Sequence, residues 1–316
     1  MNHWPGAVTA GMMSRMTTGD DAGGRLFPED LDGVDPVAAV MLADACRAVS
    51  AYPELVLLGA LFTAAEHVQD GWQIVCPCDP LPQGARELLA VHLEDRAATA
   101  RDVAQARQLV AAARTLQDEA ADEVTAGGRR FRIVRIEQLV RTGPDGPEPP
   151  RPTDLDALPA RDRVAGRPYD LLPEDGAASG YAMSELLCQV LDASAAGGGE
   201  PSGAFLTPVA LAPAFTVAER GERRWRPVGR LHDAPQQARD SLVTYFRHVV
   251  PAVESPAATD VARFAEAAEL MEDETRRNGI AVAGRRFRIV RIERVTLMGP
   301  DGPEPHRLRR PLSALS

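Results

Sequence analysis

The chain has 316 residues, of which 45% are hydrophobic and 25% are charged. This composition is ordinary for a globular protein, and the length is sufficient for two domains. All 35 basic residues are arginine, which excludes chemistry that needs a lysine, such as a Schiff base, a pyridoxal-phosphate anchor or a Walker A phosphate site. The formal net charge of −10 argues against non-specific binding of nucleic acid.

The N-terminal segment and the cysteines bear on where the protein resides. Residues 1–25 hold no continuous apolar segment, so we expect a disordered tail, and no apolar run in the chain reaches the roughly 20 residues of a membrane helix. The cysteines have no disulfide or metal-ligand pattern, although the close pair Cys76 and Cys78 leaves a metal or redox pair open. We therefore expect a cytoplasmic protein with no cofactor and no metal.

The first half of the chain is predicted to form three helices and three strands. Helical spacing covers 35–49, and strand formers follow at 55–66. A polar turn at 67–71 leads to a strand that contains Trp72, which predicts a β-hairpin. Helices are expected at 82–93, beginning with Pro82, and at about 102–123, ending at Gly127 and Gly128. The third strand begins at 129.

Most of the sequence occurs twice. The string GRRFRIVRIE at 128–137 recurs at 284–293, and GPDGPEP at 143–149 recurs at 299–305, both at an offset of 156. Upstream, Phe62 and Trp72 correspond to Phe215 and Trp225 at an offset of 153. A period this long is too large for a solenoid and is the size of a domain. The repeat predicts two similar domains in tandem that arose by duplication.

The repeated basic block is predicted to be a strand that ends in a tight turn. Phe131 and Ile133 lie on one face by alternation, and Val134 and Ile136 lie on the other. The strand is therefore buried on both faces or contains a bulge near Ile133. GPDG is a turn sequence, and the prolines after it favour an extended segment.

These elements predict an α+β protein. Each domain would be a helix-covered antiparallel sheet with the order α-β-β-α-α-β. The expected boundaries are a tail at 1–25, a first repeat domain at 26–149, a proline-rich linker at 150–178 and a second repeat domain at 179–316. In the second domain, helices are expected at 181–191, 235–246 and 260–276, with Asn278 and Gly279 ending the last. A flexible insertion is expected at 195–203.

The block RRFRIVR…GPDGPEPPRP, the PQxAR helix start at Pro82 and the YPEL segment at 52–55 resemble an uncharacterised actinobacterial family of unknown function. The resemblance covers most of both repeats and implies the fold and the taxonomic type, but no activity. In the second copy, His306 replaces the second proline of the motif. This difference leaves it open whether the last segment docks as the first one does.

The arginines of the repeated strand are the first candidates for a functional site. They could bind a small anion or a partner, because guanidinium groups bind phosphate and carboxylate well. The alternatives are nucleic acid and a structural role, in which the arginines pair with acidic residues of the preceding helix, such as Asp118 and Asp122. The candidate residues are Arg130, Arg132, Arg135, Arg286, Arg288 and Arg291.

A second set of candidates is shared by the two repeats outside the basic strand. A glutamate near a tryptophan could be an acid of raised pKa, or it could simply pair with an arginine. The set comprises Glu66, Trp72, Arg86, Glu219, Trp225 and Arg239. No histidine recurs in both repeats, and no residues form a triad or a metal set, so no catalytic residue is predicted.

Three functions stay open. The favoured one is a non-catalytic interaction or ligand-binding protein, whose partner is a protein or a small anionic ligand. The second is an enzyme with a single active site in an interdomain cleft, and the third is a nucleic-acid-associated regulator. The oligomeric state is not predicted.

Overall fold

The computed structural model describes residues 36–69, 71–156, 169–171, 205, 207–222, 224–273 and 275–306. The expected tail at 1–25, the helix at 181–191 and the insertion at 195–203 lie outside these residues. None of the helices in the described part of the chain has the length and apolar character that a membrane span requires.

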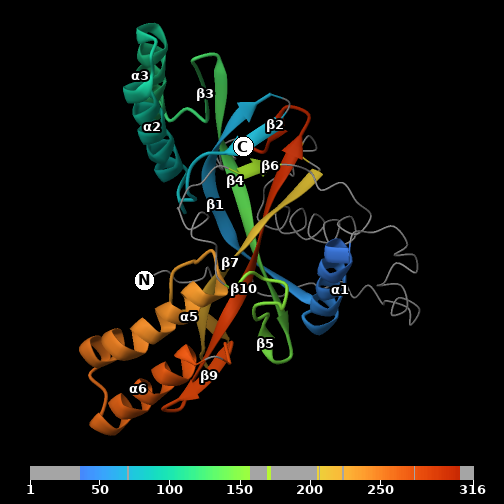
Figure 1. Ribbon diagram of the computed structural model, residues 1–316, viewed down its shortest axis with the longest axis vertical. Helices are drawn as coiled ribbons and strands as arrows, with labels where there is room; N and C mark the ends of the chain where they lie inside the picture. The colour runs from blue at the N-terminus through green and yellow to red at the C-terminus, as the bar shows by residue number, and fades with distance from the viewer. Residues whose placement is uncertain are drawn as a thin grey trace, which may run out of the picture. The chain divides into compact units, whose positions relative to one another are not determined.

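The protein has an α+β fold with a single antiparallel sheet (Figure 1). The sheet order is β6-β2-β1-β4-β10-β7-β8, with β3 and β5 pairing with β4, and β9 and β11 pairing with β10. The two repeats therefore share one sheet, a point that the sequence leaves open, and two separate domains are not shown. The long strands are β1 (Glu54–Val68), β4 (Arg129–Gly143), β7 (Thr207–Arg220) and β10 (Arg285–Gly299).

Short strands flank the long ones. They are β2 (Gly71–Ile74), β3 (Glu123–Ala126), β5 (Gly146–Pro147), β6 (Tyr169–Leu171), β8 (Trp225–Pro227), β9 (Gly279–Val282) and β11 (Gly302–Pro303). Strand β6 lies in the segment expected to be a linker and pairs with β2. The hairpin predicted around Trp72 is confirmed, because β1 and β2 pair antiparallel with His67 opposite Trp72.

The helices occur in the predicted order with corrected ends. They are α1 (Pro36–Ala51), α2 (Pro82–Thr99), α3 (Val103–Asp118), α5 (Pro235–Thr244), a π-helix η3 (Tyr245–Glu254) and α6 (Ala258–Glu272). Asp102 caps α3, since its side chain accepts a hydrogen bond from the Ala104 amide at 2.9 Å.

Helices α3 and α6 end earlier than predicted. Helix α3 stops because Ala120 has a positive φ of 50°, and Glu123, the last residue of the predicted helix, begins β3 instead. Gly127 and Gly128 lie in the turn between β3 and β4 and do not end a helix. Likewise, Gly279 begins β9 rather than ending α6, which stops at Glu272.

Compact units of the chain each combine segments from both repeats. The unit that we call the α5–α6 unit comprises the described parts of Met1–Leu58, Leu139–Pro159 and Ala212–Glu293. The other, the α2–α3 unit, comprises the described parts of Gly59–Gln138, Ala160–Leu211 and Arg294–Ser316. The GPDGPEP segment of each repeat therefore belongs to the unit that holds the helices of the other repeat.

Both faces of the basic strand are buried, which is the first of the two alternatives that the alternation leaves open. In the α2–α3 unit, Phe131 and Ile133 are fully buried against α2 and α3, whereas Val134 and Ile136 are fully buried with Trp72. In the α5–α6 unit, Phe287 and the helices α5 and α6 form the matching core. Burial of one such aromatic or aliphatic side chain contributes roughly 1.5–3 kcal/mol to folding.

Candidate functional site: two arginine–tryptophan clusters

The repeated GPDGPEP segments form equivalent hairpins, which we call the first clasp (143–149) and the second clasp (299–305). In the first clasp Gly143 pairs with Gly146, and in the second Gly299 pairs with Gly302. Gly146 and Gly302 have φ values of 110° and 107°, a backbone conformation that residues other than glycine rarely adopt. The predicted tight turn is thus present in both copies.

Each clasp contacts the basic strand and the tryptophan of the other repeat. The Glu304 carbonyl accepts a hydrogen bond from the Arg135 amide at 3.1 Å, and the Glu148 carbonyl accepts one from the Arg291 amide at 2.9 Å. The second clasp also lies on Trp72, as the first lies on Trp225. The replacement at His306 therefore does not prevent the last segment from docking in the same way.

In the α2–α3 unit, the second clasp supplies a carboxylate to the basic strand. Asp301 accepts hydrogen bonds from Arg130 at 3.2 Å and from Arg132 at 2.7 Å. Glu123, opposite Arg132 on β3, pairs with the same arginines at 2.8 and 2.7 Å. The guanidinium carbon of Arg132 lies 5.0 Å from the centroid of the Trp72 ring, which adds a cation–π contact. This cluster is neutralised within the chain.

The carboxyl group of Asp301 should reveal this pairing by its titration. Hydrogen bonds from Arg130 and Arg132 lower its pKa from 3.8 to about 2. Because the folded pKa is depressed, the stabilisation is present above pH 3.8 and is lost as the pH falls through about 2. We expect a carboxyl titration by NMR to give a midpoint near this lower value. A midpoint at the ordinary value would show that Asp301 is not held by the arginines.

The α5–α6 unit contains the matching arginines without the carboxylates. Arg288 keeps the equivalent backbone contact, donating to the Pro147 carbonyl at 2.9 Å, and lies 5.2 Å from the centroid of Trp225. Gly279 occupies the place of Glu123, opposite Arg288 in the strand register. Asp145, the counterpart of Asp301, is exposed and makes no ion pair among the described residues.

The result is a cationic cluster around Trp225 that no carboxylate of the described chain neutralises. Arg286 is exposed and has no ion-pair partner there, and Arg220 lies 5.7 Å from the centroid of Trp225 on the neighbouring strand. We call Arg220, Trp225, Arg286 and Arg288 the Trp225 cluster. The pair Arg286 and Arg288 beside an aromatic ring can bind an anionic group, as the equivalent pair Arg130 and Arg132 binds Asp301 in the other unit.

The remaining candidate arginines, Arg135 and Arg291, form ion pairs with buried carboxylates. Arg135 donates to Glu137 at 2.6 Å, and Arg291 donates to Asp154 at 3.0 Å. The partners come from strands and from the segment after the first clasp, so the pairing expected with Asp118 of the preceding helix is wrong. Both side chains are therefore committed to the fold.

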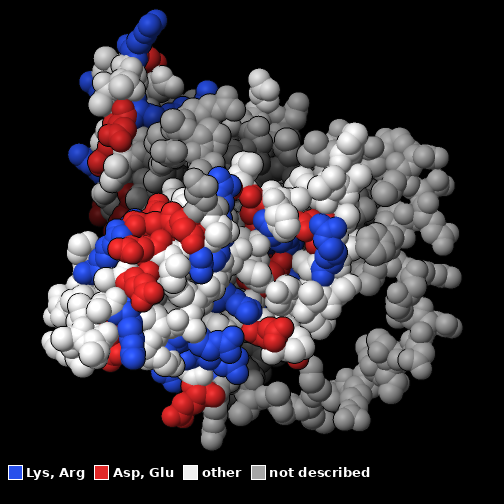
Figure 2. All heavy atoms as spheres, turned by 60° about the horizontal axis from the view of Figure 1, so that its bottom comes forward, with Lys and Arg blue, Asp and Glu red and all other residues white. Residues whose placement is uncertain are grey.

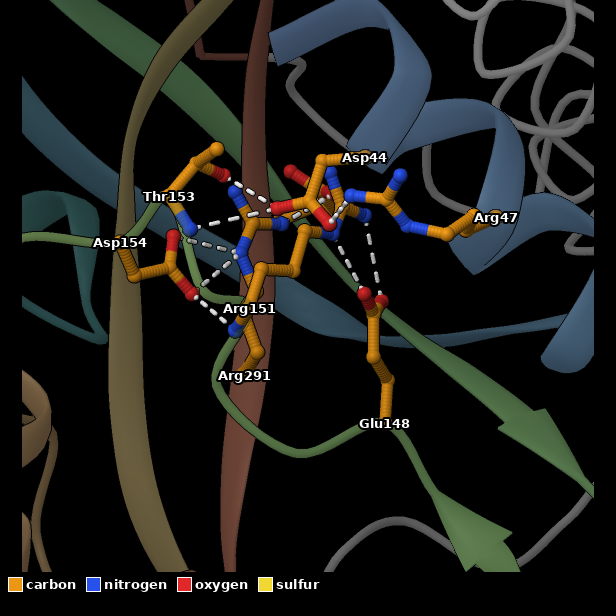
Figure 3. A network of polar contacts seen from close by, with 8 residues as sticks. Asp44, Arg47, Glu148, Arg151, Thr153, Asp154 and Arg291 are labelled. Atoms are coloured by element: carbon orange, nitrogen blue, oxygen red, sulfur yellow. Dashed lines mark hydrogen bonds and ion pairs between the residues drawn. The ribbon is translucent and has the colours of Figure 1, made fainter. Parts of the chain in front are cut away.

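Arg291 belongs to a larger polar network after the first clasp (Figure 3). Arg151 donates to Glu148 at 2.5 Å and to Glu293 at 2.8 Å, while Asp44 accepts from the Thr153 hydroxyl at 2.5 Å. Burial alone would raise the pKa of Glu293, but Arg291, Arg151 and Arg141 outweigh it and lower the pKa. The network ties helix α1 to a turn at 151–154, which replaces the extended segment expected there.

The second set of predicted residues also lies in ion pairs. Glu66 accepts from Arg129 at 2.5 Å and from Arg96 at 2.9 Å, and Glu219 accepts from Arg285 at 2.6 Å. Arg86 and Arg239 do not reach these glutamates. Their partners are Asp122, at 2.6 Å from Arg86, and Asp156 beside Arg239. Trp72 and Trp225 join the two arginine clusters described above.

Sequence reasoning missed the residues that distinguish the two clusters. Glu123 was assigned to the end of a helix, and Gly279 was read as a helix stop. Comparison of the repeats at an offset of 156 contains the signal, because it aligns Glu123 with Gly279. The loss of a carboxylate between the two copies can therefore be read from the sequence, but its position opposite the arginines becomes clear only from strand β3.

Metal and thiol chemistry find no support at the described positions. Within the described ranges, no three His, Cys, Asp or Glu side chains are grouped so that they could hold a metal ion. Burial raises the pKa of the Cys76 thiol to about 12, so this thiol stays protonated and is a poor nucleophile near neutral pH.

Comparison with known proteins identifies the family. A family model described as "Family of unknown function (DUF5954)" matches residues 35–309. The chain belongs to this family. The single DUF5954 match spans both copies of the repeat, so the family unit contains the pair and not one repeat. The exchange of clasps agrees with this, because neither DUF5954 repeat supplies all the segments of a compact unit. No curated protein and no solved structure matched the chain.

Proposed function

We propose that the protein is a non-catalytic binding protein that uses the Trp225 cluster to bind a carboxylate-bearing segment of a partner protein. The observation that carries the proposal is the comparison of the two clusters. The same arginine pair holds Asp301 in the α2–α3 unit, and the pair Arg286 and Arg288 lacks both carboxylates in the α5–α6 unit. An acidic side chain from a partner would supply what Glu123 and Asp301 supply in the other unit.

A protein partner is favoured over nucleic acid by charge. The chain has a net charge of −10, and Figure 2 shows a face where arginines and acidic residues form small alternating clusters rather than one basic surface. Nucleic-acid binding requires a basic patch or stripe that follows the phosphates. Tryptophan and arginine are, in contrast, the residues most enriched at the energetic centres of protein interfaces.

An enzyme with a single active site in an interdomain cleft is the alternative. Its candidates were Glu66, Arg86, Glu219 and Arg239. All of them lie in ion pairs with other residues of the chain, which counts against their use as an acid or a base. No contact among the described residues favours this alternative over binding.

We also infer a cytoplasmic location and an origin by duplication. The buried Cys76 is a free thiol, which suits a reducing compartment. The two identical strings and the matching clasps support duplication of an ancestral repeat, with two similar domains in tandem before the clasps were exchanged. The arginine-only composition and the GPDGPEPPRP motif support an actinobacterial source.

The test measures binding of a short poly-aspartate peptide by isothermal titration calorimetry at low salt. We expect the double substitution R286A/R288A to weaken binding by about tenfold or more, since each lost charge-assisted hydrogen bond removes on the order of 1.5–3 kcal/mol. The substitution Gly279→Glu should do the same, because it installs the counterpart of Glu123. A Cβ at Gly279 would lie 3.5 Å from the nearest backbone atom, which is ordinary contact.

Two results would contradict the proposal. One is the absence of peptide binding to the unaltered protein at low salt. The other is binding that Gly279→Glu leaves unchanged, which would place the acidic peptide elsewhere. A single-stranded DNA oligonucleotide serves as the competing probe, and tighter binding of DNA than of the peptide would favour the nucleic-acid alternative. Arg263→Ala, at an exposed helix position, is the matched control.

A further inference from the structure

A separate cavity lies inside the α5–α6 unit, at the first turn of α5. Its volume is about 250 Å³, and its lining combines prolines with charged and amide side chains. Arg239, which is 3% exposed, reaches this cavity from α5, and Arg276 and Asn278 reach it from the segment before β9. The lining also includes Pro150, Arg151, Asp154 and Asp156.

The equivalent place in the α2–α3 unit is filled by the chain itself. His306 lies there with its ring 5.6 Å from the ring of Phe62, and its Nδ1 is 3.1 Å from Asp122. Asp122 in turn accepts a hydrogen bond from Arg86, the counterpart of Arg239. One carboxylate thus faces one guanidinium, and an imidazole occupies the remaining space.

Three replacements change this arrangement in the α5–α6 unit. Pro150 stands where the other copy has His306, which removes the ring that would fill the space. Asn278 stands in the place of Asp122, which removes a carboxylate, and Arg276 stands in the place of Ala120, which adds a cation. Arg276 and Ala120 have nearly the same positive φ, 48° and 50°, so the backbone is alike in both copies.

The chain replaces the lost carboxylate only in part. Asp156 contacts both Arg239 and Arg276, the latter at 3.1 Å, so one carboxylate faces two guanidinium groups. The other charged residues of the lining form ion pairs outside the cavity. Arg151 pairs with Glu148 and Glu293, and Asp154 pairs with Arg291.

We propose that this cavity is a binding site for a small anion, a carboxylate or a phosphate, held by Arg239, Arg276 and the amide of Asn278. Two guanidinium groups face one carboxylate here, whereas one guanidinium faces one carboxylate in the α2–α3 unit. The extra positive charge favours a ligand with a single negative charge. The Asn278 Oδ1 accepts from Arg239 at 2.8 Å, so its amide nitrogen is a donor with no acceptor among the described residues. The cavity lies just below the usual size for ligand pockets, roughly 300–1,000 Å³, so the ligand is compact.

The site is distinct from the Trp225 cluster and does not depend on the proposed partner. The positive end of the α5 dipole also favours an anion here, since Pro235 at the start of that helix lines the cavity. The α2–α3 unit has no need for such a ligand, because Asp122 and His306 already occupy the matching place.

The experiment titrates the full chain with acetate, with inorganic phosphate and with sulfate, using calorimetry and thermal unfolding. We expect one of these anions to bind with a stoichiometry of one, and Asn278→Asp to weaken that binding by about tenfold, since it restores the carboxylate found in the other unit. Arg276→Ala should have a similar effect. Each variant introduces the residue that the other copy already has, so both should keep their unfolding temperature.

The outcomes separate this site from the Trp225 cluster. Binding that is lost in N278D and R276A but kept in R286A/R288A supports the proposal, and the anion that binds most tightly, acetate or phosphate, identifies the ligand as a carboxylate or a phosphate. If the unaltered protein binds none of the three anions at millimolar concentration, the proposal is overturned. It is also overturned if both N278D and R276A bind the anion as tightly as the unaltered protein does. If N278D does not fold, the anion affinity of R276A alone tests the proposal.

Discussion

Replacing Arg291 with alanine is expected to lower the free energy of unfolding by about 3–5 kcal/mol, because it leaves buried carboxylates without their counter-ion. Arg291 is 8% exposed and donates to both oxygens of Asp154, at 3.0 and 3.1 Å, and to Glu293. Its backbone amide also holds the first clasp through the Glu148 carbonyl. The measurement is chemical denaturation followed by circular dichroism.

A matched control distinguishes burial from charge alone. Arg263 pairs with Asp260 at 3.1 Å on the surface of α6, with 64% of its side chain exposed, and its replacement by alanine should cost at most about 1 kcal/mol. Equal losses for Arg291 and Arg263 would show that the network of Figure 3 contributes no more than a surface pair.

The pH dependence of the Arg291 variant gives a second readout. The pKa of Glu293 is lowered in the folded protein, so its contribution is present above the usual pKa near 4.5 and is lost as the pH falls through the depressed value. Removing Arg291 removes one of the cations that hold this pKa down. The difference in stability between the two proteins should therefore shrink as the medium becomes acidic.

The sequence predicted the individual helices and strands better than it predicted which segments contact one another. Alternation in the basic strand correctly separated Phe131 from Val134, because a buried strand must satisfy both faces. Strands β3 and β9 were missed, since four residues beside a Gly-Gly or Asn-Gly pair carry too little periodicity to outweigh the signal of a helix end. A positive φ at Ala120, not a glycine, ends the helix, and composition does not reveal that conformation.

The exchange of clasps could not be predicted from the repeat alone. An offset of 156 shows which residues are equivalent, but it does not show whether Asp301 contacts the strand of its own repeat or that of the other one. Both choices place the same residue types together, and only the path of the chain decides between them. The candidate arginines were consequently identified as one set, although Arg132 is neutralised by Asp301 and Arg288 is not.

The unequal clusters follow from small replacements on an equivalent backbone. At three equivalent positions the α2–α3 unit has Glu123, Asp122 and His306, whereas the α5–α6 unit has Gly279, Asn278 and Pro150. In the first two cases the α2–α3 unit carries a carboxylate that pairs with its arginines, and in the third it carries a ring that contacts Asp122, whereas the α5–α6 unit lacks all three groups. On our proposals, an acidic segment of a partner or a small anion supplies the groups that the α5–α6 unit lacks.

The clasps themselves should be as sensitive to mutation as the buried network. We expect Gly302→Ala to destabilise the protein by at least about 2 kcal/mol, because the φ of 107° is strained for alanine and the new Cβ would lie 2.2 Å from the Nε1 of Trp72. Gly146→Ala should act in the same way, since its Cβ would lie 2.2 Å from the Nε1 of Trp225. Thermal unfolding of the two variants measures the effect.

Two other glycines separate backbone strain from the contact with tryptophan. Gly128 has a φ of 75° and no atom within 4 Å of an added Cβ, so Gly128→Ala reports strain alone, whereas Gly71→Ala, also in open space and without the positive φ, should be nearly neutral. If G302A costs no more than G128A, the tryptophan contact does not hold the clasp. A larger loss for G302A and G146A, by comparison, would mean that each repeat depends on the clasp of the other, so that neither could fold as a compact unit alone.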